Sequence, residues 1–255
     1  MKNRITKLFE DKTGDILSIY ITAGYPNLDS TLEVIKNLDR VGVDMIELGF
    51  PFSDPLADGP VIQQSGQTAI NNGMTLAVLF DQLEELRKVT SIPMVLMGYL
   101  NPVLQFGEHQ FIRKCADVGI DGIIIPDLPM NYYLSNFEEI CTSENIFNIM
   151  LVSPQTSEKR IKEIDEHCNG FLYVVSSNSI IGSVGGKMSE TYLTKIKQLP
   201  LKKPTLTGFG IHDNLGFTTA CKYSKGAIIG SAFIKHISTN GTSYLSIQQF
   251  VNTIR

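Results

Sequence analysis

Cysteines, basic clusters and long apolar runs are all scarce in this sequence, and each scarcity excludes a class of protein. The four cysteines, at positions 115, 141, 168 and 221, are far apart and form no C-x-x-C pair. Neither a zinc site nor a disulfide framework is therefore indicated. The formal net charge is -4, and no run of Lys and Arg is longer than two residues. Nucleic acid and anionic membranes are accordingly not expected as main partners.

The sequence also lacks the segments that direct a chain into or across a membrane. Residues 1–8 are charged and contain no apolar run of signal-peptide length. No stretch approaches the ~20 apolar residues of a membrane span. These features predict a cytoplasmic protein.

Two nucleotide-binding signatures are missing as well. The turn at 23–26 carries no G-x-G-x-x-G, so a dinucleotide site is not indicated there. The segment 181–188 departs from a phosphate-binding P-loop, because Ile181 replaces the leading Gly and Met188 replaces the Ser or Thr.

What the sequence does contain is a regular alternation of apolar, β-branched segments with helical patterns. After a polar helix at 3–11, eight strands are expected, at 16–22, 45–49, 93–98, 122–126, 146–152, 171–176, 205–208 and 227–229. Eight βα units in this chain average about 32 residues each, and no Gly/Ser-rich linker divides them. The pattern predicts an α/β fold, a single-domain (β/α)8 TIM barrel over residues 1–255 with a short N-terminal helix. An open doubly wound sheet is the alternative, and the missing dinucleotide fingerprint counts against it.

The stretch 46–60, IELGFPFSDPLADGP, joins a short apolar strand to a proline-broken loop and holds differently placed acids. Side chains alternate along a strand, so Glu47 shares its face with apolar neighbours, and burial should raise its carboxyl pKa toward neutrality, as an acid/base catalyst requires. Asp54 and Asp58 lie on the loop and should stay ionised, which indicates a second role. On spacing alone, a partly exposed strand-end Glu47 and two turn-forming aspartates are an equally consistent interpretation.

Further polar and aromatic side chains fall where the predicted strands end. In a barrel, functional groups lie at the C-terminal ends of strands and on the loops that follow. Besides Glu47, the residues at these positions are Tyr20, Thr22, Tyr99, Asn101, Asp127 and Tyr173. Each alone is better explained as a core aromatic or a polar cap, but their convergence on one rim favours an active site.

Glycine-bearing turns predict a phosphate site at the same rim. Gly210 follows the strand at 205–208, and Gly230 with Ser231 opens a helix after 227–229. Barrels commonly hold phosphate at this place with backbone N–H groups and a helix N-terminus. Gly182, on the long loop after 171–176, adds a further N–H. Any one of these glycines could simply turn the chain, but three such loops around one mouth favour phosphate binding.

The stretch 46–60 closely resembles the signature of the tryptophan synthase α chain family. Four later stretches agree in order, so the resemblance covers essentially the whole chain: YLNP at 99–102, PDLP at 126–129, GFGI at 208–211 and GSA at 230–232. The resemblance implies a lyase of tryptophan biosynthesis that cleaves indole-3-glycerol phosphate to indole and glyceraldehyde 3-phosphate. It also implies that this chain uses no metal and no organic cofactor.

The resemblance assigns roles to individual residues. It implies that Glu47 is the principal acid/base and that Asp58 holds the indole N–H and stabilises positive charge developing on the ring. Tyr173 matches the tyrosine next to the acid/base. The positions that match the indole-pocket walls are Tyr20, Met97 and Phe209. Those that match the phosphate loops are Gly182, Gly210, Gly230 and Ser231.

One departure from the family pattern keeps a second hypothesis open. The family's mobile loop usually carries a Gly-Val-Thr-Gly-like run, whereas 178–184 reads NSIIGSV, with Ile181 at the Thr position. That Thr ordinarily bonds the loop acid, here Asp58, and Ile cannot do so. The alternative function is a catalytically weakened barrel acting mainly as a binding or regulatory subunit. Under either hypothesis the resemblance implies an α2β2 complex with a tryptophan synthase β chain that carries pyridoxal phosphate.

Overall fold

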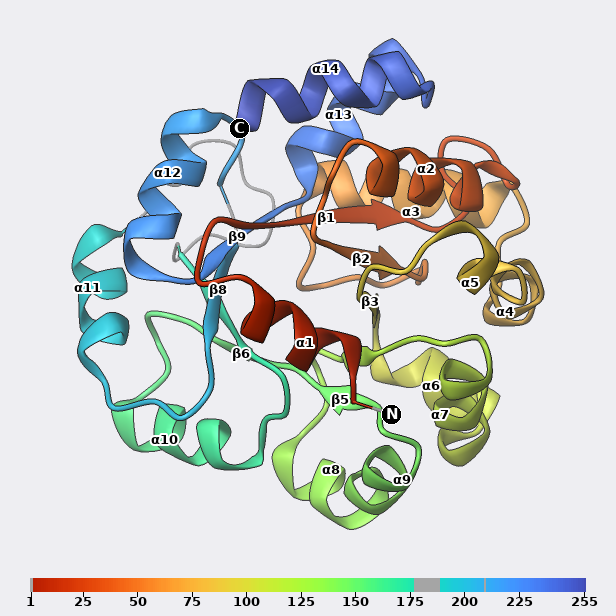
Figure 1. The fold of residues 1–255 in the computed structure, drawn as a ribbon. Coiled ribbons are helices and arrows are strands. Elements are labelled where there is room, and N and C mark those ends of the chain that lie inside the picture. The colour runs from red at the N-terminus through yellow and green to blue at the C-terminus, as the bar shows by residue number, and fades with distance from the viewer. Residues whose placement is uncertain (1, 177–188, 209) are drawn as a thin grey trace.

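Nine parallel strands form one sheet in the computed structural model, which describes residues 2–176, 189–208 and 210–255 (Figure 1). The order of the strands in the sheet is β5-β4-β3-β2-β1-β9-β8-β7-β6. Their bounds are β1 (Ile16–Thr22), β2 (Met45–Gly49), β3 (Met94–Met97), β4 (Gly122–Ile124), β5 (Phe147–Asn148), β6 (Met150–Val152), β7 (Leu172–Val175), β8 (Thr205–Gly208) and β9 (Gly226–Ile229).

The sheet curls into a nearly closed barrel that meets itself at Ile149. β5 pairs with β4, β6 pairs with β7, and only Ile149 separates β5 from β6 along the chain. The Ile149 N–H donates to the Ile123 carbonyl at 2.9 Å, so the β4 pairing continues to the break. The barrel expected from the sequence is confirmed. The single strand expected at 146–152 is instead divided, because its first part follows one neighbour and its second part follows the other.

Helices lie on the outside of the barrel, as the alternating pattern predicts (Figure 1). Several begin at a Ser or Asp whose side chain accepts a backbone N–H of the first turn, as Ser157 and Asp213 do. The outer helices are α2 (Ser30–Arg40), α3 (Pro60–Asn71), α4 (Leu76–Leu83), α5 (Leu86–Val89), α6 (Leu100–Phe106), α7 (Glu108–Asp117), α8 (Met130–Asn136), α9 (Glu138–Ser143), α10 (Glu158–His167), α11 (Glu190–Gln198), α12 (Asn214–Tyr223), α13 (Ser231–Asn240) and α14 (Tyr244–Ile254).

Alternation along the strands divides the core into two layers. Ile46 and Leu48 of β2 pack outward into the layer beneath the helices, whereas Met45 belongs to the layer that fills the barrel. Both layers are largely apolar, which is typical of a parallel sheet covered on both faces. Glu47 lies between Met45 and Gly49 on the inward-facing side of β2, and a charged residue there is unusual enough to require an explanation.

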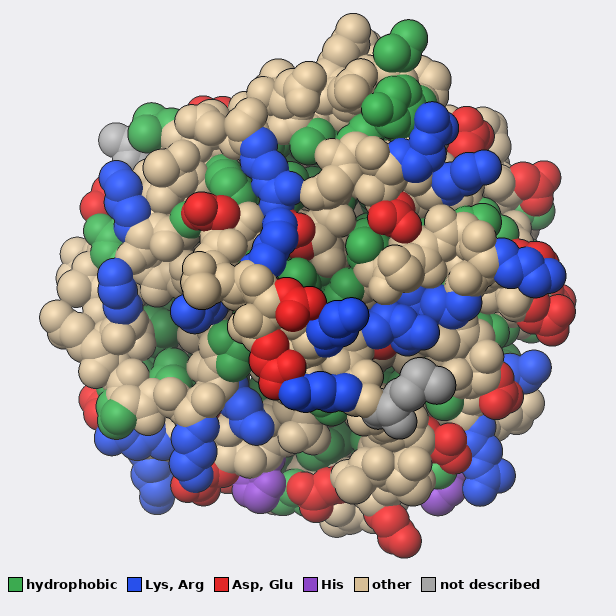
Figure 2. Space-filling model, in the orientation of Figure 1, with side chains coloured by type: hydrophobic (Ala, Val, Ile, Leu, Met, Phe, Trp, Pro, Cys, Tyr) green, Lys and Arg blue, Asp and Glu red, His purple; other side chains and the backbone are tan. Residues whose placement is uncertain are grey.

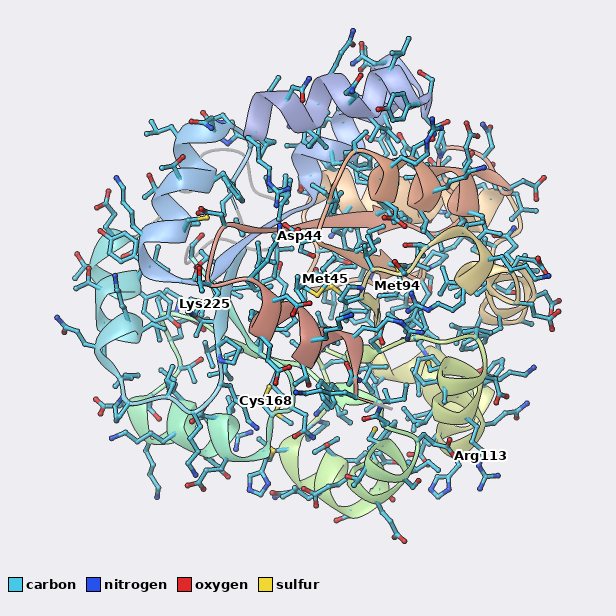
Figure 3. All side chains as sticks on the ribbon, viewed as in Figure 1. Asp44, Met45, Met94, Arg113, Cys168 and Lys225 are labelled. Carbon is cyan, nitrogen blue, oxygen red and sulfur yellow. The ribbon has the colours of Figure 1, made fainter. Side chains whose placement is uncertain are left out.

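The N-terminal end of the barrel is closed by α1 (Arg4–Asp11), which lies across the strand starts (Figure 1). Ile5 of this helix is fully buried among the interior residues. Around it, Asp121 accepts hydrogen bonds from Arg4 and Arg87 at 2.9 and 2.7 Å, and Asp44 pairs with two further cations. Figure 2 shows basic and acidic side chains gathered on this face, and Figure 3 shows Asp44 near the centre of it. Ion pairs and α1 therefore occupy this end, and the functional cleft lies elsewhere.

Candidate active site

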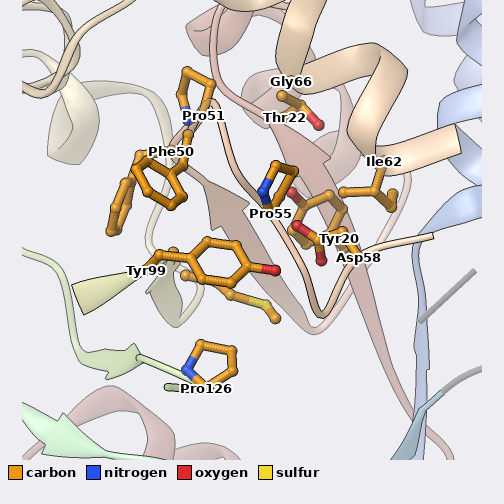
Figure 4. A pocket seen from close by; sticks show the side chains of 13 residues that line it. Tyr20, Thr22, Phe50, Pro51, Pro55, Asp58, Ile62, Gly66, Tyr99 and Pro126 are labelled. Carbon is orange, nitrogen blue, oxygen red and sulfur yellow. The ribbon is translucent and has the colours of Figure 1, made fainter. Parts of the chain in front are cut away.

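A cleft opens beside the C-terminal ends of β1, β2 and β3 (Figure 4). Its walls are largely aromatic or proline side chains, with one carboxylate. The lining residues are Tyr20, Thr22, Phe50, Pro51, Phe52, Pro55, Asp58, Ile62, Gly66, Met97, Gly98, Tyr99 and Pro126. The cleft thus brings together the predicted Tyr20, Asp58 and Met97, which come from three separate parts of the chain.

Glu47 lies in the barrel interior beside this cleft and is fully buried. In the sheet it is level with Tyr20 of β1 and Val95 of β3. Neither of its carboxyl oxygens has a hydrogen-bond partner among the described residues. Burial raises the Glu47 pKa to about 8, and the Ser18 hydroxyl opposes that rise. The carboxyl is therefore mostly protonated at neutral pH, as its place on the strand predicted.

Asp58 occupies the loop between β2 and α3 and is half-buried. Its backbone N–H donates to the Pro55 carbonyl at 3.0 Å, and its own carbonyl accepts from Gln63 Nε2 at 2.8 Å. Burial raises the Asp58 pKa to about 6, and a hydrogen bond with the Tyr99 hydroxyl lowers it. Asp58 is thus largely ionised at neutral pH, but its carboxyl is more desolvated than its place on a loop predicted.

The sequence did not reveal what Tyr99 does. Its hydroxyl accepts a hydrogen bond from the Ala57 N–H at 3.0 Å and lies within bonding reach of the Asp58 carboxyl. Its ring packs against Phe52, with ring centroids 5.4 Å apart. Tyr99 therefore fastens the loop after β2 to the end of β3, and its hydrogen bond with Ala57 joins residues 42 positions apart in the sequence.

Two glycines allow tyrosine rings to lie against neighbouring strands. A Cβ built at Gly49 would come within 2.0 Å of the Tyr20 hydroxyl oxygen, and one at Gly208 within 2.3 Å of that of Tyr173. Tyr173 is buried on β7, and its phenol pKa is raised well above the ordinary value by burial and by the charges of Glu47 and Asp58. Both phenols stay protonated, so they can act as hydrogen-bond donors beside the acid.

Of the predicted phosphate residues, Gly230 and Ser231 lie close to the same cleft. Gly230 caps the start of α13, and Ser231 is the first helical residue. A Cβ built at Gly230 would be 3.4 Å from Cβ of Tyr20, so the N-terminus of α13 adjoins the cleft wall. Gly210 is exposed and has φ of 75°, a conformation that glycine adopts freely. Gly182, Phe209 and Ile181 lie outside the described residues.

The structure shows the surroundings of three further rim residues, Asp127, Asn101 and Thr22. The Asp127 carboxylate accepts the Leu100 N–H at 2.9 Å and so supports the start of α6. Asn101 is exposed on that helix. Thr22 lines the cleft, and its hydroxyl lies 2.7 Å from that of Ser65 on α3.

Neither a metal-binding cluster nor a membrane-spanning helix is found in the part of the chain that the structure describes. No three His, Cys, Asp or Glu side chains of residues 2–176, 189–208 and 210–255 lie together as a metal would need. Within the same residues, every helix is too short or too polar to span a bilayer.

Comparison with known proteins agrees with this geometry. The family model described as tryptophan synthase alpha chain matches residues 7–253. The tryptophan synthase alpha chain of Flavobacterium johnsoniae is 53% identical over 256 residues, which cover 99% of this chain and 100% of that protein. That of Flavobacterium psychrophilum is 51% identical and covers 99% of each chain. The crystal structure of tryptophan synthase subunit alpha from Legionella pneumophila is 32% identical over the full length of both chains, with a TM-score of 0.85. This chain belongs to the tryptophan synthase alpha chain family.

Proposed function

We propose that this protein catalyses the α reaction of tryptophan synthase, the retro-aldol cleavage of indole-3-glycerol phosphate to indole and glyceraldehyde 3-phosphate, in tryptophan biosynthesis. The observation that carries the proposal is the fully buried Glu47, whose pKa is about 8, beside a cleft that contains the Asp58 carboxylate. An acid that holds its proton near pH 7 and a neighbouring carboxylate that has lost its proton are suited to opposite steps of acid/base chemistry.

The proton transfers balance around Glu47. Its neutral carboxyl gives a proton to the ring carbon that bears the glycerol phosphate side chain, and Glu47 becomes a carboxylate. That carboxylate then takes the proton of the side-chain hydroxyl, the carbon–carbon bond opens, and its electrons return to the ring. Indole leaves with the new C–H bond, the aldehyde leaves as glyceraldehyde 3-phosphate, and Glu47 is protonated again. No metal or organic cofactor of this chain is needed for these steps.

Asp58 supports the step in which the ring becomes positively charged. We assign its carboxylate to the indole N–H, where negative charge stabilises the protonated ring. Tyr20 and Met97 form walls of the cleft, and we assign them to the indole ring together with Phe209. We assign Tyr173 as a neutral phenol beside the acid that donates a hydrogen bond, an assignment supported by its burial and raised phenol pKa.

The phosphate is assigned to the loops after β8 and β9. Gly230 and Ser231 at the start of α13 supply backbone N–H groups that have no partner within the helix. Gly210 and Gly182 complete the proposed set. Inorganic phosphate should compete with the substrate, and Ser231→Asp should raise KM because it places like charge against the phosphate. Competition is measured at constant ionic strength; an unchanged KM in the variant would return these residues to a purely structural role.

The catalytic assignment is tested with Glu47→Gln, which keeps the size of the side chain but cannot cycle a proton. We expect kcat for indole release to fall by at least about 100-fold while phosphate still binds. Asp58→Asn should also slow turnover without unfolding the protein, because Asp58 lies on a loop. Near-normal turnover of folded Glu47→Gln would contradict the assignment of Glu47 as the acid/base. The weakened-barrel alternative would instead be favoured if the purified wild-type protein released no indole from indole-3-glycerol phosphate.

We further propose that the 255 residues work as one domain in the cytoplasm and bind a tryptophan synthase β chain as an α2β2 complex. The β chain, not this one, would carry pyridoxal phosphate. Leu56 is 87% exposed on the loop that carries Asp58, and Leu104 is 43% exposed on α6, so both present apolar surface near the cleft mouth. Leu56→Asp should weaken binding of a cognate β chain in sedimentation experiments, whereas Leu245→Asp, at the start of α14, should not.

A further inference from the structure

Ser18 places a hydroxyl in an otherwise apolar part of the barrel interior. It alternates with Leu17 and Ile19 of the outer layer, so it faces inward, and its exposed fraction is 0%. Its partners across the sheet are Met45 on β2 and Ile228 on β9, both apolar residues of the interior layer. The Ser18 Oγ has no hydrogen-bond partner among the described residues.

Folding alone does not account for this hydroxyl. A buried hydroxyl with no partner has lost its hydrogen bonds to water and gained none in return, which is unfavourable for the folded state. An alanine at position 18 would occupy the same place in the layer without that cost. The hydroxyl is therefore expected to have a partner in a state that the resting protein does not show.

Glu47 is the acidic group nearest to Ser18 in the sheet. Ser18 is paired with Met45, two residues before Glu47 on the inward face of β2, so Glu47 lies one step further toward the cleft on the adjacent strand. Both Glu47 carboxyl oxygens are buried and, like the Ser18 Oγ, have no partner among the described residues. Three unpartnered polar atoms thus lie together inside the barrel. The two groups do not meet hydrogen-bond geometry in the resting structure. They lie close enough for the Ser18 hydroxyl to lower the Glu47 pKa as a hydrogen bond to the carboxylate does, against the larger effect of burial.

We propose that Ser18 is a positioning residue that donates a hydrogen bond to Glu47 when Glu47 is ionised. The proposal rests on the proposed function, in which Glu47 is a carboxylate for half of the catalytic cycle. During that half, the Ser18 hydroxyl holds one carboxylate oxygen from the side away from the cleft, so that the other oxygen faces the hydroxyl proton of the substrate. This hydrogen bond stabilises the ionised form of Glu47 relative to the neutral form. It thereby favours the first proton transfer, in which Glu47 gives its proton to the indole ring.

The other groups around Glu47 do not titrate in the same range. Tyr20 from β1 and Tyr173 from β7 have phenol pKa values raised above their ordinary value, so both stay neutral. Asp58, from the loop after β2, titrates near pH 6 and is already ionised where Glu47 loses its proton. The inward residues of β3, Val95 and Met97, carry no titratable group. A change in Glu47 titration near pH 8 can therefore be traced to its immediate hydrogen bonds.

The test is direct titration of Glu47 in the folded protein. The full chain is labelled with ¹³C at the glutamate side-chain carboxyls, and the Glu47 signal is identified by its absence in Glu47→Gln. Removing one hydrogen bond to a charged group should move the midpoint in Ser18→Ala upward by about one pH unit. Ser18→Thr keeps the hydroxyl and should restore the wild-type midpoint. Ser246→Ala, which removes a buried hydroxyl from the outer helix α14, is the matched control and should leave it unchanged.

An unmoved Glu47 midpoint in folded Ser18→Ala would overturn the proposal. If Ser18→Ala does not fold, Ser18→Cys takes its place, since a thiol is a weaker donor of similar size, and its midpoint must also move upward. The basic limb of the pH profile of kcat/KM should move with the Glu47 midpoint measured by NMR in each variant. The proposed function is judged separately: if the wild-type protein released no indole from indole-3-glycerol phosphate, the function would fail, whereas the titration result for Ser18 would still stand.

Discussion

Replacing Glu47 by glutamine should stabilise the protein in a pH-dependent way. The Glu47 pKa is raised from 4.5 to about 8 in the folded state, so the unfolded chain loses this proton at a lower pH than the folded one. Stability should therefore fall as pH rises from about 4.5 to about 8, because the folded state binds more protons throughout that range. Below pH 4.5 the Glu47 carboxyl is neutral in both the folded and the unfolded state, so its burial costs no stability through ionisation. Above about pH 8 the carboxyl is ionised in both states, and the full free-energy cost of burying the charge lowers the stability of the folded protein.

The size of the penalty follows from the pKa difference. About 3.5 units at about 1.4 kcal/mol each give an upper limit of about 5 kcal/mol above pH 8. Glutamine is neutral at every pH but brings an amide that needs partners of its own, which offsets part of the gain. We therefore expect Glu47→Gln to be more stable than wild type by about 2–3 kcal/mol at pH 9, a substantial part of the ~5–15 kcal/mol that stabilises an ordinary domain.

The assay is urea unfolding at pH 5, 7 and 9 and constant ionic strength. Wild type should lose stability relative to Glu47→Gln between pH 5 and pH 9, so the two curves should diverge with rising pH. Glu84→Gln is the matched control, because Glu84 is exposed at the end of α4 and its substitution should leave the wild-type pH dependence intact. Parallel curves for wild type and Glu47→Gln would refute the reasoning, since they would mean that Glu47 titrates alike in both states.

Three further predictions concern the cleft and the closed end of the barrel. Gly49→Ala should raise KM for indole-3-glycerol phosphate about 10-fold or more in steady-state assays, because the new Cβ would displace Tyr20 from the cleft wall. Tyr99→Phe removes the hydroxyl that lowers the Asp58 pKa, so kcat should fall more at pH 6 than at pH 8; equal loss at both pH values would argue against this link. Asp44→Ala removes two ion pairs and the acceptor of a buried backbone N–H, so urea unfolding should show a loss of about 3 kcal/mol with kcat little changed.

The architecture and the acid pair were readable from the sequence because both depend on local patterns. Alternating apolar strands and helical repeats predict the barrel without knowledge of the long-range contacts. Each βα unit must bury one face of its strand in the barrel interior and the other beneath the helices. Likewise Glu47 lies between inward-facing positions of one short strand, which is consistent with a buried carboxyl of raised pKa. On spacing alone a partly exposed strand-end residue was equally consistent, and the family resemblance decided between the two. The loop position of Asp58 gave its ionised state but not its partial burial, which depends on what packs above the loop.

Only the tertiary structure decided the contacts that tune these groups, because they join residues far apart in the chain. The bond from Tyr99 to the loop of Asp58 and the division of the predicted fifth strand at Ile149 depend on how neighbouring strands are staggered around the barrel. A serine within an apolar strand carries no signal of its own. The role proposed for Ser18 depends on the register of β1 and β2, which places its unpartnered hydroxyl near the unpartnered carboxyl of Glu47.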